Sequence, residues 1–208
     1  SSLAEDKAIW VIKGRNTVID SVAFSGAKNR YQNGSGIRFL GAGLVVRRSR
    51  FLRNEAGILT RGQDESAISA TTILSEVDPD LGSHVLLEFN EFGFNGAGDG
   101  QSHNVYIGDE DRLTFRYNYS HHALGGHLLK SRARINNIRS NRLTDEQEGI
   151  TSYLIDLSNG GVSYIVGNVL FQSFRPGNQQ LISFGAEGPM DSASRLFVFH
   201  NTAYNQSV

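Results

Sequence analysis

The chain has 208 residues, with 20 Lys and Arg against 21 Asp and Glu, and it contains no cysteine. The net charge of −1 gives no electrostatic reason to expect nucleic acid as a partner. No apolar run approaches the roughly 18–20 residues that a membrane span needs. Disulfides and thiolate metal sites are excluded as well.

Seven segments along the chain share one form, in which an alternating apolar strand is followed by Asn or a substitute and then by further apolar residues. They are 17–24, 44–51, 85–92, 113–120, 135–143, 163–170 and 196–203, with Val22, Ser49, Asn90, Asn118, Asn141, Asn168 and Asn201 at the equivalent position. Most steps between these positions are the length of one short coil of a β-solenoid. We interpret the two long steps, Ser49 to Asn90 and Asn168 to Asn201, as coils that carry insertions.

A second series of short strands alternates with the first. It comprises 36–41, 57–62, 103–109, 126–132, 152–157 and 181–187. Two alternating series separated by Gly and polar turns predict an all-β, right-handed parallel β-helix of about seven to eight coils. Residues 1–208 then form a single domain, which we expect to be a mature form or a fragment because neither end shows an obvious cap. A β-sandwich of short strands is the alternative.

The repeated Asn has two physical uses in such a helix. Asn tolerates the left-handed backbone conformation of a sharp corner. Stacked amides also hydrogen-bond to one another along the axis. We further expect Phe24, Phe51, Phe92, Phe171 and Phe199 to point inward and form stacks of core side chains.

Two loops in the middle of the chain are polar and close to each other in sequence. The segment "GDGQSHN" (98–104) is Gly-rich and suited to lining a binding groove. The next loop, "GDEDR" (108–112), supplies Asp109, Glu110 and Asp111. Clustered carboxylates suit Ca²⁺, which takes six to eight oxygen ligands, so these three residues are the metal candidates, although acidic turns are more often simply solvated.

A basic segment follows, "GHLLKSRAR" (126–134), with Lys130, Arg132 and Arg134. By strict alternation Leu129 points inward and Lys130 outward. Because coils stack about 4.8 Å apart, the preceding and following coils should contribute neighbours to the same outer face. These expected neighbours are His103, Asn104, Tyr106, Tyr153 and Asp156.

Histidine is the side chain best suited to proton transfer near neutral pH. His103 and His127 begin successive strands of one series, so we predict that they lie close together and form an acid–base pair. His121 and His122 are adjacent and point in opposite directions on a strand; His122 is a candidate for substrate contact. Glu187, at the end of a later strand of the same series, is a candidate second carboxylate or binding residue.

The arrangement of strands resembles the pectate-lyase-like superfold, and the basic segment resembles the family of alginate lyases and chondroitinase B. Lys130-Ser131 stands where that family has its "KS" pair, Asn141 stands at the corner, and "YLIDLSNGG" (153–161) stands at the second motif. The resemblance implies that Lys130 removes the C5 proton of a uronate while Ca²⁺ neutralises the sugar carboxylate. Arg132 and Arg134 would clamp uronate carboxylates.

The chain departs from that family at the position of the catalytic arginine, where it has Asp156 or Ser158. A carboxylate beside Lys130 favours the charged lysine, and a charged lysine does not accept a proton. The resemblance implies a carbohydrate-active protein that cleaves a uronate-containing polysaccharide by β-elimination and is secreted, periplasmic or on the cell surface. The alternative is a non-catalytic polysaccharide-binding or cell-surface solenoid. The sequence leaves the oligomeric state and the identity of the glycan open.

Overall fold

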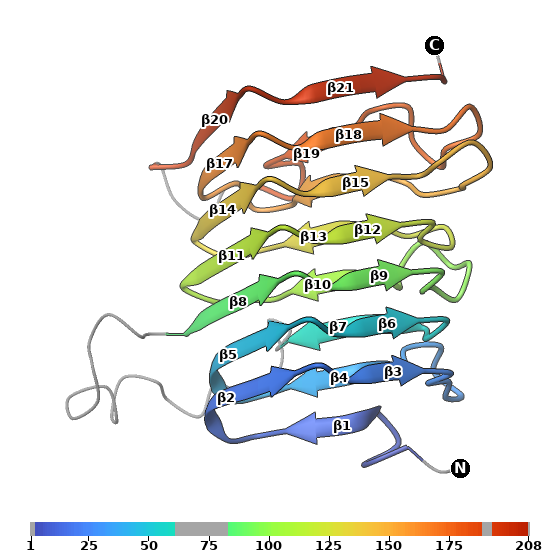
Figure 1. The fold of residues 1–208 in the computed structure, drawn as a ribbon, viewed down its shortest axis with the longest axis vertical. Helices are drawn as coiled ribbons and strands as arrows, with labels where there is room; N and C mark the ends of the chain where they lie inside the picture. The colour runs from blue at the N-terminus through green and yellow to red at the C-terminus, as the bar shows by residue number, and fades with distance from the viewer. Residues whose placement is uncertain (1–2, 61–82, 189–192, 208) are drawn as a thin grey trace.

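The computed structural model describes residues 3–60, 83–188 and 193–207. The chain winds into a column of seven coils, and each coil contributes one strand to each of three sheets (Figure 1). The N-terminal coil lies at one end of the column and the C-terminal coil at the other. Residues that are one coil apart in sequence therefore become neighbours in space.

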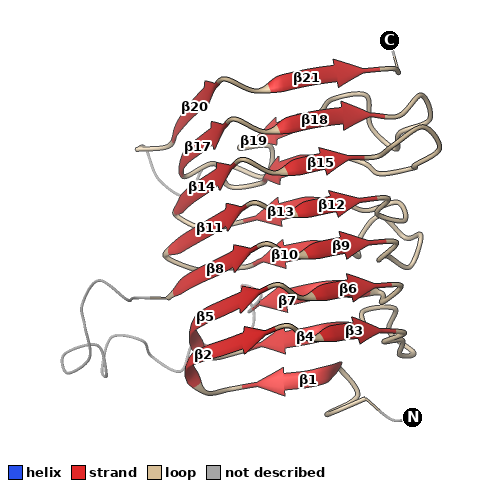
Figure 2. Cartoon of the chain, in the orientation of Figure 1, coloured by secondary structure: helices blue, strands red, loops and turns tan. Residues whose placement is uncertain are grey.

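Sheet A is the first sheet that each coil enters (Figure 2). Its strands are β1 (Ala8–Ile12), β4 (Ser35–Phe39), β7 (Ala56–Thr60), β10 (Val105–Ile107), β13 (Leu129–Ser131), β16 (Ile155–Leu157) and β19 (Ile182–Phe184). Sheet B follows in each coil. Its strands are β2 (Arg15–Asp20), β5 (Ala42–Arg47), β8 (His84–Glu88), β11 (Arg112–Arg116), β14 (Ile135–Arg139), β17 (Val162–Val166) and β20 (Arg195–Phe199).

Sheet C completes each coil before the chain returns to sheet A. Its strands are β3 (Ala23–Ser25), β6 (Arg50–Leu52), β9 (Glu91–Gly93), β12 (Tyr119–His121), β15 (Arg142–Thr144), β18 (Val169–Gln172) and β21 (Thr202–Asn205). Neighbouring strands in all three sheets pair in parallel, for example β10 with β13, β11 with β14 and β12 with β15. The predicted parallel β-helix is thus confirmed, and the β-sandwich alternative is wrong.

The interior is a continuous column of apolar side chains that all three sheets enclose. The rings of Phe24, Phe51 and Phe92 stack in it, with centroids 4.8 and 5.0 Å apart, as the sequence predicts. The predictions for Phe171 and Phe199 are wrong, since Phe171 is only half-buried and Phe199 is exposed. The inward position is two residues after the repeated Asn, which Phe92 occupies, whereas Phe171 stands three residues after Asn168 and Phe199 two residues before Asn201.

The repeated polar position forms a ladder at the corner between sheets B and C. The backbone N–H of each member donates to the side-chain oxygen of the next: Val22 to Ser49 at 3.1 Å, Ser49 to Asn90 at 2.9 Å, and Asn90 to Asn118 at 2.9 Å. The same bond continues through Asn141 and Asn168 to Asn201. Each amide nitrogen also donates to a backbone carbonyl, as Asn118 Nδ2 does to Leu87 at 2.8 Å.

The conformational reason that we gave for this Asn is wrong. The left-handed residue is the one before it, namely Ser21, Arg48, Phe89, Tyr117, Ser140, Gly167 and His200. The Asn is selected by its hydrogen bonds, because it satisfies buried backbone groups of two neighbouring coils at once.

Candidate functional site

One outward-facing row of sheet A brings together residues that are far apart in sequence. Strand register pairs Tyr106 of β10 with Lys130 of β13, and Lys130 with Asp156 of β16. These side chains alternate with buried neighbours such as Leu129, as the pattern predicts. The row continues to Leu59 and Arg38 on the coils before it.

The centre of this row is a cluster of ion pairs. Lys130 Nζ lies 3.3 Å from Asp156 Oδ2 and 2.8 Å from Glu187 Oε1. Arg132 contacts the other oxygen of Glu187 and donates from Nε to the Tyr106 hydroxyl at 2.8 Å. The hydrogen bond from Lys130, with a further one from Arg132, lowers the pKa of Glu187 to about 2. Glu187 is therefore ionised at neutral pH and paired with both cations.

Asp156 is buried and receives contacts from three side chains. The Ser158 hydroxyl donates to Oδ2 at 2.7 Å, Lys130 approaches the same oxygen, and His127 Nε2 lies 3.6 Å from it. The prediction that Lys130, His127 and Asp156 share one outer face therefore holds.

His103 and His127 stack with ring centroids 4.6 Å apart beside this row. Each accepts a backbone N–H at Nδ1: His103 from His127 at 3.0 Å, and His127 from Tyr153 at 3.1 Å. A neutral imidazole that accepts at Nδ1 carries its hydrogen on Nε2. Both rings thus carry a hydrogen on Nε2; that of His127 faces Asp156, and His103 lines the pocket described below.

Burial makes both imidazoles hard to protonate. It lowers the pKa of His127 to about 4, with Lys130 acting in the same direction and Asp156 against it. Burial, together with the charges of His127, Lys130 and Arg132, also lowers the pKa of His103 well below its ordinary value. A neutral ring without a free lone pair orients a ligand rather than exchanging a proton with it.

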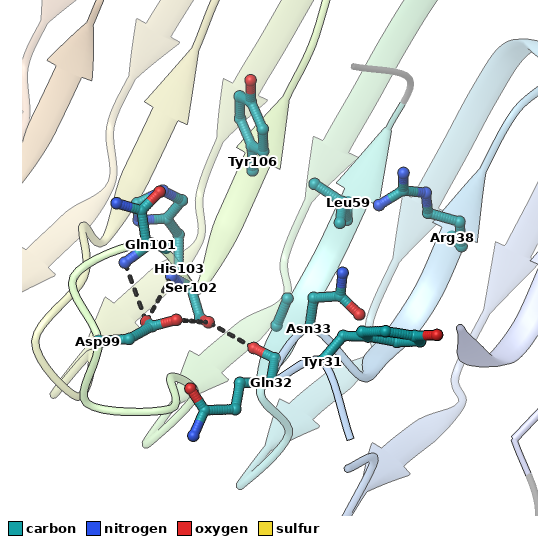
Figure 3. Close-up of a pocket in the computed structure, with 11 residues that line it drawn as sticks. Tyr31, Gln32, Asn33, Arg38, Leu59, Asp99, Gln101, Ser102, His103 and Tyr106 are labelled. Atoms are coloured by element: carbon teal, nitrogen blue, oxygen red, sulfur yellow. Dashed lines mark hydrogen bonds between the residues drawn. The ribbon is translucent and has the colours of Figure 1, made fainter. Parts of the chain in front are cut away.

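A pocket of about 330 Å³ adjoins the cluster on its N-terminal side (Figure 3). Tyr106 and His103 line both the pocket and the cluster, so the two form one groove. The opposite wall includes Tyr31, Asn33 and Arg38. Polar residues therefore follow the outer face of sheet A over several coils.

The loop that closes this pocket is fixed by its own hydrogen bonds. Asp99 Oδ1 accepts the backbone N–H groups of Gln101 and Ser102, and the Ser102 hydroxyl donates to the Gln32 carbonyl at 2.8 Å. The segment 98–104 thus lines a groove, as its composition predicts. The contribution of Tyr31 to Asn33 was missed, because nothing in that segment distinguishes it from an ordinary polar turn.

Three predicted contact residues lie away from this centre. Asn104 is fully buried and donates to the Phe92 and His121 carbonyls, so it is an interior residue, not a groove residue. His122 follows sheet C, where its ring stacks on Phe94 at 4.7 Å. Arg134 is exposed beyond the end of β13. By contrast, Tyr153 packs against His127, with ring centroids 5.2 Å apart.

The three predicted metal ligands have different surroundings. Asp109 is exposed, Glu110 is buried, and Asp111 Oδ2 accepts the Ser83 backbone N–H at 3.2 Å. Within the described residues no group of three His, Cys, Asp or Glu side chains is placed to hold a metal ion. Asp109, Glu110 and Asp111 are thus not gathered in one group of carboxylates, and Ca²⁺ binding by this loop stays a prediction.

In the part of the chain that the structure describes, no helix is long and apolar enough to cross a membrane. No significant match to a curated protein or to a solved structure was found. The family model described as "Right handed beta helix region" matches residues 4–171, which is most of the chain. This match agrees with the seven coils and three parallel sheets. The chain therefore belongs to the right-handed β-helix family.

Proposed function

We propose that this β-helix binds a uronate-containing polysaccharide along the outer face of sheet A and cleaves it by β-elimination. The shape of the groove supports a polymer as the ligand. From Arg38 to Asp156 the outer row changes its residue at every coil, at a spacing of about 4.8 Å. An extended chain that crosses the coils meets a different side chain at each step.

The charges support a uronate. β-Elimination removes the proton on the carbon next to the carboxylate, and that proton becomes more acidic when the carboxylate is neutralised. Lys130 and Arg132, from one end of β13, already hold a carboxylate together, that of Glu187. We assign carboxylate neutralisation to these two cations. This differs from the family resemblance, which gives Lys130 the role of base, because Lys130 is held between two carboxylates.

Tyr106 is suited to the proton transfer. Its oxygen accepts a hydrogen bond from Arg132 Nε, so the hydroxyl hydrogen is not used in that bond and can be given to a ligand. In the proposed reaction the Tyr106 phenol gives its own proton to O4 as the C4–O4 bond breaks, and its oxygen takes the C5 proton. The electrons of the C5–H bond form the C4–C5 double bond, O4 leaves as a hydroxyl, and the phenol is regenerated. His103, which lines the pocket, donates from Nε2 and orients the sugar, and His127 stacks on it and faces Asp156. The observation that carries the proposal is the carboxylate held by Lys130 and Arg132 next to the Tyr106 hydroxyl.

The test is incubation with alginate, polygalacturonate and glucuronate-containing glycosaminoglycans, with cellulose as the neutral control. Cleavage by elimination creates a conjugated double bond, which is followed by ultraviolet absorbance. Tyr106→Phe should lower turnover by about 10²–10⁴-fold while binding persists. Tyr164→Phe removes the same hydroxyl from the outer face of sheet B and should have no effect. Release of no unsaturated product from any polyuronate would exclude the reaction.

The second candidate function is binding without cleavage. It is favoured by the internal pairing of the cluster, in which Lys130 is engaged by two carboxylates and both imidazoles accept at Nδ1. Affinity electrophoresis separates the two functions: a pure binding protein is retarded by the glycan, and the glycan keeps its length after prolonged incubation.

A further inference from the structure

We infer that Lys130 and Arg132 form a preformed carboxylate-binding subsite, that Glu187 of the protein itself occupies it, and that a sugar carboxylate binds by taking the place of Glu187. The inference names the ligand group through the proposed function, and it adds a competing residue that controls access to the site.

The two cations are nearly buried and have further partners, whereas the carboxylate of Glu187 is about half exposed. The side chains of Lys130 and Arg132 are only 12% and 11% exposed, against 45% for Glu187. Arg132 donates hydrogen bonds to the Tyr106 hydroxyl and to Asn159 Oδ1. Lys130 is held by Asp156. Glu187 reaches the pair from the connection that follows β19, two coils farther along, so rotation of its side chain into solvent empties the subsite and leaves its walls in place.

When Glu187 leaves the subsite, the remaining side chains carry an excess positive charge that favours binding of an anion. With Glu187 present, two cations face two carboxylates, those of Asp156 and Glu187. Without it, two nearly buried cations share the single buried carboxylate of Asp156, and His103 and His127 are neutral. An uncompensated buried charge is costly, so a second carboxylate is recruited.

Arg132 and Lys130 differ in how they bind an anion. Arg132 offers a planar set of N–H groups, and Lys130 offers a point charge. Together they bind the two oxygens of one carboxylate, as they do with Oε2 and Oε1 of Glu187. A neutral sugar has no group that replaces the charge of Glu187. The subsite therefore selects acidic over neutral polysaccharides. Glu187 reduces the apparent affinity for an acidic ligand, which binds only in the fraction of time that the subsite is empty.

The test uses Glu187→Gln, which keeps the size of the side chain and removes its charge, and Glu187→Ala, which removes both. Binding of galacturonate is measured by calorimetry and by the NMR signal of Arg132 Nε–H, with galactose as the neutral probe. Both variants should bind galacturonate about tenfold more tightly than the wild type, with galactose unchanged. Glu148→Gln, which removes an exposed carboxylate from the loop between β15 and β16, is the matched control and should bind like the wild type.

A second readout guards against loss of folding. Galacturonate should raise the unfolding temperature of Glu187→Gln more than that of the wild type, because a ligand stabilises the state that it binds. The double variant Glu187→Gln/Arg132→Gln should lose the gain in affinity, which shows that the gain passes through the two cations.

The outcomes separate this inference from the proposed function. If Glu187→Gln and Glu187→Ala bind galacturonate no more tightly than the wild type, the inference is wrong, even where a polyuronate is cleaved. If they bind galacturonate at Arg132 and no polyuronate is cleaved, the subsite stands and the lyase reaction does not. A tenfold gain for galactose as well would also overturn the inference, because it would show a steric effect instead of a charge effect.

Discussion

Two rows of side chains run along the same column and obey the same register, yet they differ in what they repeat. The interior row at the corner between sheets B and C keeps one residue type on successive coils, from Asn90 to Asn201. The outer row of sheet A changes at every coil, from Arg38 through Tyr106 and Lys130 to Asp156. The stacking of coils thus fixes the positions of the residues in both rows. From Asn90 onward the residue type is constant in the interior row, and it varies in the row on the outer face.

The difference between the two rows indicates which positions of a solenoid are available for function. Every coil presents the same buried backbone groups to the ladder, so the same amide satisfies each of them. Nothing in the stack requires a particular residue in the outer row. We therefore propose that a ligand accounts for the residues Tyr106, Lys130 and Asp156 of that row and for Glu187, which contacts Lys130 from the loop after β19. Four changes test this difference.

The largest effect on stability is expected from the ladder. Asn118→Leu removes the acceptor of the Asn90 N–H and the donor to the Leu87 carbonyl, and both groups are buried. We expect the free energy of unfolding to fall by about 3–5 kcal/mol. Urea denaturation measures it. Asn137→Ala, on the outer face of β14, is the control and should cost less than about 1 kcal/mol; equal losses at the two positions would contradict the comparison.

The outer site should make stability depend on pH, whereas the uncharged ladder does not. Unfolded histidine takes up a proton below about pH 6.5, but His127 in the folded protein does so only near pH 4. Between these values the unfolded state binds more protons, so stability falls as the pH falls, by on the order of 3 kcal/mol.

His127→Asn should remove the His127 share of that pH dependence, because the amide retains an acceptor for the Tyr153 N–H and does not titrate. His103, whose pKa is also lowered by burial, keeps its own share. His200→Asn, at an exposed position, is the control. Glu187 acts in a separate window: its pKa is lowered to about 2, so its contribution is lost only below about pH 4.5. Unfolding measured from pH 8 to pH 3 distinguishes the two windows; an unchanged slope in His127→Asn would show that another group is responsible.

The third effect concerns the ion pair itself. Lys130→Met leaves Asp156 buried beside only Ser158 and His127, which we expect to cost about 2–3 kcal/mol. The double variant Lys130→Met/Asp156→Leu removes the uncompensated charge and should be more stable than the single variant. Thermal unfolding of the three proteins compares them. A double variant less stable than Lys130→Met would mean that the cluster supports the fold rather than a ligand.

The smallest effect is expected on the outer face of sheet B. Val18 is 60% exposed there, so Val18→Thr should change the unfolding free energy by no more than about 0.5 kcal/mol. The same substitution at Val46, which is fully buried in the next coil, should cost about 1–3 kcal/mol, because it buries a hydroxyl. Similar results at both positions would mean that sheet B has no solvent-facing side.

Sequence reasoning identified the coils and the main ladder because both depend on a short repeating pattern. It also placed Lys130 outward and near His127 and Asp156, since one coil's shift relates these residues. It failed for Phe171, which stands one residue beyond the inward position of its strand. It also failed for asparagines that stack at a corner other than the one between sheets B and C. Asn54, Asn95 and Asn104 form a second ladder, in which the Asn54 N–H donates to Asn95 at 3.0 Å, and their irregular spacing concealed it.

The all-β class, the parallel stacking of coils and the ladder are predictable from the amino-acid sequence, because every coil repeats the same backbone requirement. The contact of Glu187 with Lys130 and Arg132, the hydrogen bonds at Nδ1 of both imidazoles and the interior position of Asn104 are visible only in the folded chain. These features depend on distances between coils and on loop paths of unequal length. These contacts do not recur from coil to coil, so no repeating pattern in the sequence predicts them.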